Sequence, residues 1–379
     1  MFIPRLESLR GIAALMVALG HCFLVFEVDG VANIAEPAFH ELSGYRSWIT
    51  RILLILFNGP AAVTVFFVLS GYVLGVSLQR HSQTIRSSIA FLLRRICRIY
   101  PAHMVALGVI VYFLSAVHVH RAYVPASEVY ISWYDLELSR ELIASNAGLF
   151  NNALNPVSWT LTIEMGISLA IPLMFFIVAG QSRLRNLCVF VLLVGASWTL
   201  PNNQIGRFAF VFFLGLMLSR PGFEWVVART PRGRSLVLAG AITILLLARE
   251  LTRGIDMRWA ILLETLSAAV LIQYLVLDGI RERWVRVLDW PVVRSLGRYS
   301  FSFYLWHFII LYWLSTAVFR YVEIDVNRQY TLTLSFVLSI VSVFVTYHVS
   351  AMSYRWVEVP GIKLGKWLTA RLAGPREER

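Results

Sequence analysis

An arginine and a histidine stand eleven residues apart near the start of the chain, in a segment that is otherwise largely apolar. In an α-helix, eleven residues make three turns plus about 20°, so Arg10 and His21 share one face, about 16 Å apart along the axis. A positioned imidazole suits general-base chemistry, because it takes a proton from a hydroxyl near neutral pH. The spacing alone fits equally an arginine that anchors a helix end and a histidine that hydrogen-bonds a neighbouring helix.

Two further ionisable residues, Glu164 and His307, lie inside apolar runs, about 10 Å and about 14 Å from the nearer end. Such groups are costly in a membrane and are functional hypotheses by default. A carboxylate beside an imidazole orients it and raises its basicity. We therefore expect Glu164 and His307 to join His21 in a catalytic group, with a purely structural polar cluster as the alternative. Glu264 and His348 are also buried in apolar runs, with no role assigned.

Three arginines, Arg94, Arg95 and Arg98, fall within five residues beside a helix start. Guanidinium groups suit phosphate, because each donates two parallel hydrogen bonds. Binding to anionic lipid headgroups, or a simple excess of positive charge on the cytoplasmic side, fits the same pattern.

The composition places these residues in a membrane. The 379-residue chain is 58% hydrophobic and only 15% charged, which excludes an ordinary soluble enzyme and a disordered chain. The net charge of +12 does not indicate nucleic acid, because the basic residues lie between long apolar runs. The three cysteines are scattered and predict neither a disulfide framework nor a metal site.

We predict an all-α, polytopic membrane protein with about ten transmembrane helices. The chain forms a single domain over residues 1–379, with a short basic tail at 361–379. Most lysines and arginines fall in alternate short loops, which places both termini in the cytoplasm. The predicted spans run from 11 to 354: 11–29, 58–78, 102–118, 157–180, 186–200, 206–219, 235–249, 258–277, 299–318 and 330–354.

Six segments, taken together and in order, resemble the acyltransferase 3 family of bacterial membrane-bound O-acyltransferases. The chain departs from the usual pattern at Thr64, where an acidic residue is common, and at Met165-Gly166, which follow Glu164 in place of a second acid and an aromatic residue. The matching segments are Arg5–Gly11 with His21, Phe66–Tyr72, Arg94–Pro101, Trp159–Glu164, Leu296–His307 and Tyr354–Pro360.

The resemblance implies transfer of an acyl group, usually acetyl from acetyl-CoA, to a hydroxyl of a sugar. The acceptor would belong to a surface polysaccharide, a lipopolysaccharide or a related glycoconjugate at the bacterial inner membrane. We expect His21 to act as general base, with Glu164 either orienting it or binding the sugar. His307 would position the acceptor or stabilise the oxyanion, and Trp159 and Tyr304 would contact the acceptor. The phosphates of CoA would meet four arginines: Arg10, Arg94, Arg95 and Arg98.

No resident cofactor or metal is expected, and the partners would be acyl-CoA, a carbohydrate or glycolipid acceptor and the lipid bilayer. Direct transfer and an acyl-histidine intermediate both remain open. A transporter or flippase of lipid-linked glycans is the alternative function, because it also places ionisable groups inside the membrane. An accessory membrane subunit is a further alternative, in which the polar groups only hold helices together.

Overall fold

The regular structure of this chain is helical. The computed structural model describes residues 3–79, 84–116, 126–133, 136–179, 182–200, 203–220, 231–276 and 283–370. Within these ranges the only strand-like pairings are isolated bridges, Phe26 with Ala126 and Val28 with Val31. The predicted all-α class is confirmed for the described part of the chain.

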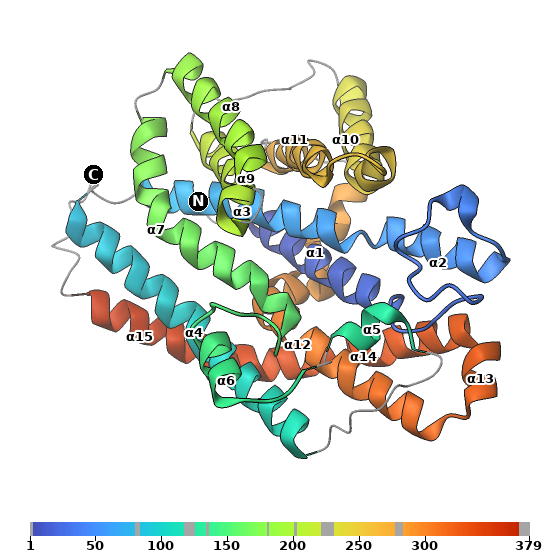
Figure 1. The fold of residues 1–379 in the computed structure, drawn as a ribbon. Helices are drawn as coiled ribbons and strands as arrows, with labels where there is room; N and C mark the ends of the chain where they lie inside the picture. The colour runs from blue at the N-terminus through green and yellow to red at the C-terminus, as the bar shows by residue number, and fades with distance from the viewer. Residues whose placement is uncertain are drawn as a thin grey trace.

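Each predicted apolar run overlaps one long helix (Figure 1). These helices are α1 (Pro4–Cys22), α3 (Gly59–Leu78), α4 (Ile85–Ala116), α7 (Trp159–Ala179), α8 (Arg183–Thr199), α9 (Gln204–Leu218), α10 (Pro231–Leu251), α11 (Met257–Val276), α12 (Pro291–Tyr321) and α14 (Thr331–Ser353). Shorter helices are α2 (Tyr45–Leu56), α5 (Glu128–Ser132), α6 (Arg140–Ala147), α13 (Ile324–Gln329) and α15 (Val359–Thr369).

The outer surface of the bundle is apolar, as a multi-pass membrane protein requires. Large hydrophobic side chains such as Phe176, Leu192 and Ile340 are 70% or more exposed, which would be costly in water but suits lipid. Among the described residues, six helical segments are long and apolar enough to cross a membrane. They are Tyr45–Leu78, Ile85–Ala116, Pro156–Val178, Met257–Val276, Pro291–Tyr321 and Thr331–Thr369.

The boundaries of two segments, the first predicted span and the C-terminal tail, differ from the sequence prediction. The first run was expected at 11–29, but α1 begins at Pro4 and ends at Cys22, because proline favours the first turn of a helix and the chain beyond Phe23 turns to pair Val25 with Ser127. The tail expected from residue 361 is not free at its start, since α15 packs along α4 through Gly361. Residues 371–379 of that tail lie outside the described residues.

The helices α1 and α12 pack closely against each other. Gly11 and Gly297 face each other, and a Cβ built on Gly11 would lie 2.5 Å from the backbone nitrogen of Gly297. Only glycine allows two backbones to approach so closely. The start of α1 is also held by an ion pair between Arg5 and Asp289, 2.9 Å apart; hydrogen bonds from Arg5 and Arg294 lower the pKa of Asp289. The glycine contact and the ion pair together position α1 against α12 and the segment that precedes it.

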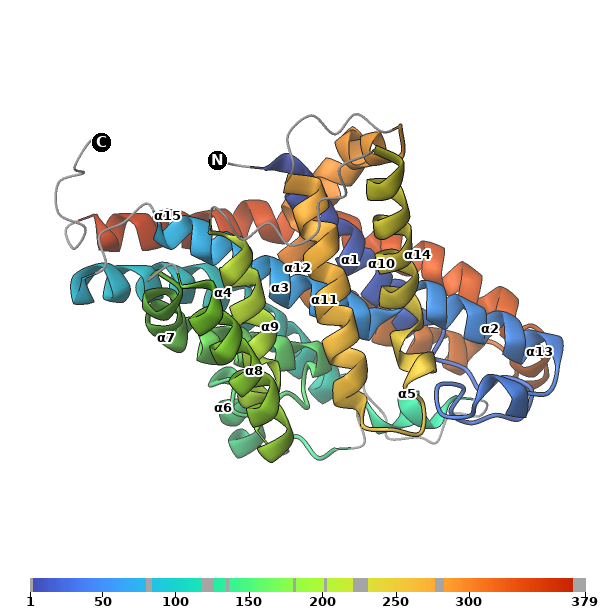
Figure 2. The ribbon, with the colours of Figure 1, turned by 90° about the horizontal axis from the view of Figure 1, so that it is seen from above.

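The short helices between the long ones lie mainly on one side of the bundle. In Figure 2, α5 and α6 lie at the side opposite the start of α1. This arrangement brings Trp133, at the end of α5, against His21 near the end of α1, with ring centroids 5.9 Å apart. The segment of the loop at residues 134–135 lies outside the described residues.

Candidate active site

Two predicted catalytic histidines meet at the α1–α12 contact. Nδ1 of His21 lies 3.1 Å from Nε2 of His307, within hydrogen-bond distance, and the two rings are stacked at 16°. His307 is buried, and its Nδ1 makes no hydrogen bond of good geometry but interacts with the backbone carbonyls of Phe303 and Tyr304 in the preceding turn. The contact therefore joins two imidazoles, and His21 also borders a cavity.

The cavity beside His21, called here the His21 cavity, has a volume of about 440 Å³. Both residues expected to contact the acceptor, Trp159 and Tyr304, line it together with Trp133. The edge-on rings of Trp133 and Phe308 hold the His21 imidazole in place. Its walls come from the ends of α1 and α10, the starts of α3, α7, α9 and α11, and the middle of α12.

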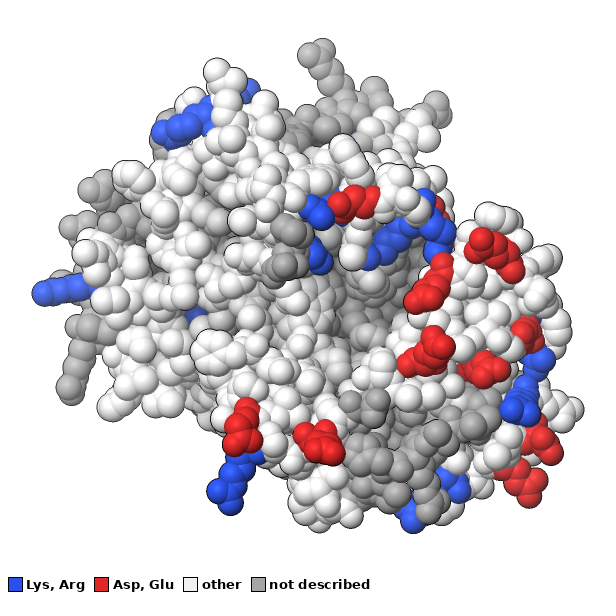
Figure 3. Space-filling view, in the orientation of Figure 1, with Lys and Arg blue, Asp and Glu red and all other residues white. Residues whose placement is uncertain are grey.

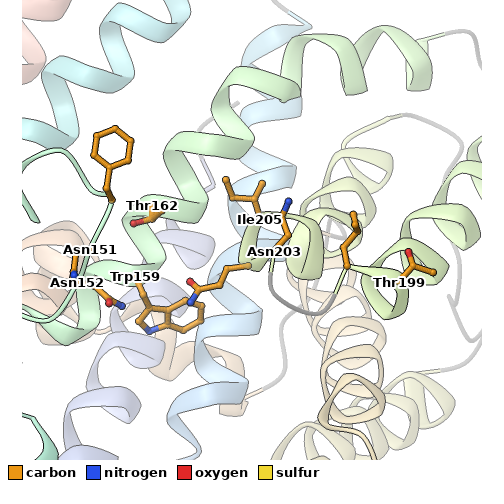
Figure 4. A pocket seen from close by; sticks show the side chains of 10 residues that line it. Asn151, Asn152, Trp159, Thr162, Thr199, Asn203 and Ile205 are labelled. Carbon is orange, nitrogen blue, oxygen red and sulfur yellow. The ribbon is translucent and has the colours of Figure 1, made fainter. Parts of the chain in front are cut away.

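A second, larger cavity of about 710 Å³ adjoins the first, and is called here the amide cavity. It shares Trp159 and Gln204 with the His21 cavity, and Figure 4 shows Asn151 and Asn152 beside the Trp159 indole, with Asn203 farther along the cavity near Ile205. Amide groups and an indole face are the groups that hydrogen-bond and stack against sugar rings. Figure 3 shows that the face viewed in Figure 1 is hollowed near its centre, with basic groups along the upper edge of the hollow.

The third cavity holds most of the predicted phosphate-binding arginines and is called here the arginine cavity. Arg10, Arg95 and Arg98 line it together with Glu164, and its volume is only about 40 Å³. Nη2 of Arg95 lies 3.1 Å from Oε2 of Glu164, and Ser168 accepts a further hydrogen bond from Arg95. The expectation that Glu164 would orient a histidine is not met, because its carboxylate is bound to an arginine from α4.

A buried carboxylate beside the arginine cluster was not assigned from the sequence. Glu358 is 2% exposed, lies 3.9 Å from Nε of Arg98, and interacts electrostatically with Arg10. It accepts a hydrogen bond from Ser302 and stands in a π-helical turn, Tyr354–Glu358, a feature frequent at functional sites. Its place in the last of the family-like segments was the only sequence signal.

Arg94 does not join the cluster. Its Nη1 donates to Oγ1 of Thr369, 3.3 Å away, because this face of α4 is covered by α15. Consecutive arginines in a helix point about 100° apart, so Arg94 and Arg95 serve different neighbours. Arg94 contacts α15, and Arg95 lines the arginine cavity.

The arginine cavity and the His21 cavity lie one above the other along the same helices. Phe301 lines the first and Tyr304 the second, about 4.5 Å apart along α12. On α1 the corresponding residues, Arg10 and Val17, are about 10 Å apart. One to two helical turns therefore separate a cationic cavity from a cavity with an imidazole in its wall.

The other intramembrane ionisable groups have different surroundings. Glu264 is fully buried and bound to Arg249 and Thr64. His348 packs against the rings of Phe344 and Tyr347 on its own helix. Among the described residues, no group of three or more histidine, cysteine or acidic side chains is arranged to hold a metal ion.

A membrane protein with a histidine pair between a cationic and an aromatic cavity fits a group-transfer enzyme with two substrates. The comparisons agree: the chain belongs to the acyltransferase 3 family, since the model of that acyltransferase domain matches residues 3–350. It is also similar to acyltransferase MdmB of Streptomyces mycarofaciens, with 26% identity over 341 residues, covering 82% of this chain and 79% of that protein. No solved structure matches the chain significantly. The protein is therefore a multi-pass membrane acyltransferase.

Proposed function

We propose that this enzyme transfers an acyl group, in particular acetyl from acetyl-CoA, to a hydroxyl of a sugar. The acceptor belongs to a surface polysaccharide, a lipopolysaccharide or a related glycoconjugate of the bacterial inner membrane. The observation that carries this proposal is the position of His21, which borders an aromatic cavity one to two turns above a cluster of arginines. In this proposal about ten helices cross the membrane, and both termini lie in the cytoplasm.

The arginine cavity receives the donor. Arg10, Arg95 and Arg98 supply three guanidinium groups for the phosphates of CoA. With a volume of about 40 Å³ the cavity has room for little more than one water molecule, so donor binding must move these side chains apart. Glu164 and Glu358 position the arginines until phosphate oxygens replace these two carboxylates as partners of the guanidinium groups.

The His21 cavity and the amide cavity receive the acceptor. Their aromatic walls and amide groups offer stacking surfaces and hydrogen bonds to a sugar. Because the arginine cavity and the His21 cavity are lined by different residues, both substrates can be bound at once. This favours direct transfer over an acyl-histidine intermediate.

The histidine pair then supplies the base. When His307 carries its proton on Nδ1, toward the backbone carbonyls, its Nε2 accepts from Nδ1–H of His21. The lone pair on Nε2 of His21 is then free to take the acceptor's hydroxyl proton. The acceptor oxygen bonds to the thioester carbon, the C–S bond breaks, and the CoA thiolate takes the proton from His21. A positioned base of this kind contributes about 10²–10⁴-fold.

Transfer of a labelled acetyl group tests the proposal. Membranes that contain the protein are incubated with acetyl-CoA labelled in its acetyl group, and label is followed into the extracted glycan. We expect transfer by the wild type and a loss of about 10²-fold or more in His21→Ala, with equal amounts inserted. Undiminished transfer by His21→Ala would remove the proposed base.

A further inference from the structure

One buried carboxylate of the membrane region has no part in the proposed chemistry. Glu264, on α11, is 0% exposed. It accepts a hydrogen bond of 2.7 Å from Oγ1 of Thr64 on α3 and one of 2.9 Å from Nε of Arg249 on α10. Removing a carboxylate from water is costly, so a charge kept in this place indicates a role beyond packing.

The partner of Glu264 reaches the acceptor cavity. The Arg249 side chain is 29% exposed and lines the His21 cavity. Glu264 is bound by Nε at 2.9 Å and by Nη2 at 3.5 Å, and in the described part of the chain Nη1 of Arg249 donates to no protein acceptor. The carboxylate thus fixes the guanidinium in one orientation and leaves one of its nitrogens for a ligand.

The charges along this cavity have one sign. Apart from His21, the charged side chains that line it among the described residues are Arg207 and Arg249, both cationic. Glu264 offsets much of the charge of Arg249, but Nη1 of Arg249 still offers a charge-assisted hydrogen bond, which favours an anionic oxygen over a neutral one. The volume of about 440 Å³ accommodates a sugar ring with such a substituent.

We infer that Arg249, positioned by Glu264, determines acceptor specificity by binding an anionic oxygen group, a carboxylate or a phosphate, carried by the sugar that is acylated. The inference rests on the proposed role of the His21 cavity as the acceptor site. The acceptor is then an acidic sugar, with its charged group on Arg249 and its reacting hydroxyl at His21.

Direct binding tests this without requiring transfer. The full chain is purified in lipid nanodiscs, and equilibrium dialysis measures its affinity for methyl β-D-glucuronide, methyl β-D-glucoside and glucose 6-phosphate. We expect the glucuronide, the phosphate or both to bind about tenfold or more tightly than the glucoside. His21→Ala should keep this preference while losing transfer, so failure of the proposed function and failure of this inference give different results.

Variants test whether Arg249 is responsible for the preference for anionic ligands. Arg249→Gln should remove it, but leaves a buried carboxylate without its cation and is expected to be less stable. The double variant Arg249→Met with Glu264→Gln removes both charges and keeps the volume. The matched control is Arg253→Gln, which has similar exposure and an ion pair of 2.9 Å with Glu250 but does not line the cavity.

The outcomes are distinct. Loss of the anion preference in the double variant, with the preference intact in the control, supports the inference. Equal affinity of the wild type for all three ligands would overturn it, as would a double variant that still prefers the anions. A double variant that lowers kcat without changing relative affinities would place Arg249 at the reacting carbonyl, which also overturns the assignment.

Discussion

Replacing Gly11 by alanine puts a methyl group where α1 and α12 are closest, and its effect can be worked out from the structure. The new Cβ would lie 2.5 Å from the backbone nitrogen of Gly297, whereas ordinary van der Waals contact begins at 3.4 Å. Because the obstacle is backbone and cannot rotate away, the two helices must separate by about 0.9 Å.

That separation exceeds what the histidine pair tolerates. The 3.1 Å between Nδ1 of His21 and Nε2 of His307 can grow by about 0.4 Å before the hydrogen bond is lost. A shift of the helix by about 0.9 Å therefore detaches His21 from its partner. Misplacing a catalytic group by about 1 Å costs about 10²-fold, so we expect kcat of Gly11→Ala to fall by that order.

The assay is labelled acetyl transfer in membranes with equal amounts of inserted protein. Gly108→Ala is the matched control, because a Cβ there meets no atom within 4 Å and alanine is the better helix former by about 1 kcal/mol. We expect the control to retain full turnover. Wild-type turnover in Gly11→Ala, with an unchanged unfolding temperature, would refute the reasoning from the helix contact to the histidine pair.

Three further results follow from the described contacts. His307→Ala should lower kcat about tenfold or more and leave the KM for acetyl-CoA unchanged, since His307 acts through Nδ1 of His21; a changed KM alone would contradict this. Glu164→Gln should raise that KM several-fold with less effect on kcat, because Arg95 loses the carboxylate that positions it; a fall in kcat alone would place Glu164 in the chemistry. The pKa of Asp289 is lowered by Arg5, so the pair stabilises the fold above the ordinary aspartate pKa. Thermal unfolding should show Asp289→Asn less stable by on the order of 0.5 kcal/mol at pH 7, with the difference decreasing as the pH falls below about 4 and vanishing below the lowered pKa of Asp289; a difference that does not decrease in acid would refute the ion pair.

The sequence predicted the helices well because membrane helices can be recognised in a sequence by their length and apolar composition. Each expected run overlaps a long helix, although α1 lies earlier than predicted since Pro4 starts it. The meeting of His21 and His307 also agrees with the expectation of a shared polar site. Six described segments satisfy the length and hydropathy criteria for spanning, so the expected number of about ten crossings remains a prediction.

The sequence could not predict the contacts that depend on how a helix is rotated about its axis. Glu164 was grouped with the histidines because it lies at a similar depth in the membrane. Depth does not say in which direction a side chain points from its helix, and α7 directs this carboxylate toward Arg95 of α4. Arg94 could not be separated from Arg95 for the same reason. Arg249 ends an apolar run and looks like a boundary residue in the sequence, and only the packing of α3, α10 and α11 places it at the acceptor cavity.

The central claim is that donor and acceptor reach His21 from two different cavities. A cryo-electron microscopy structure with a non-transferable thioether analogue of acetyl-CoA would test it most directly. We predict the analogue's phosphates on Arg10, Arg95 and Arg98 and its acetyl-like end beside Nε2 of His21, with the His21 cavity still open to an acceptor. Phosphates bound in the His21 cavity or the amide cavity, or an acyl end away from His21, would contradict the account.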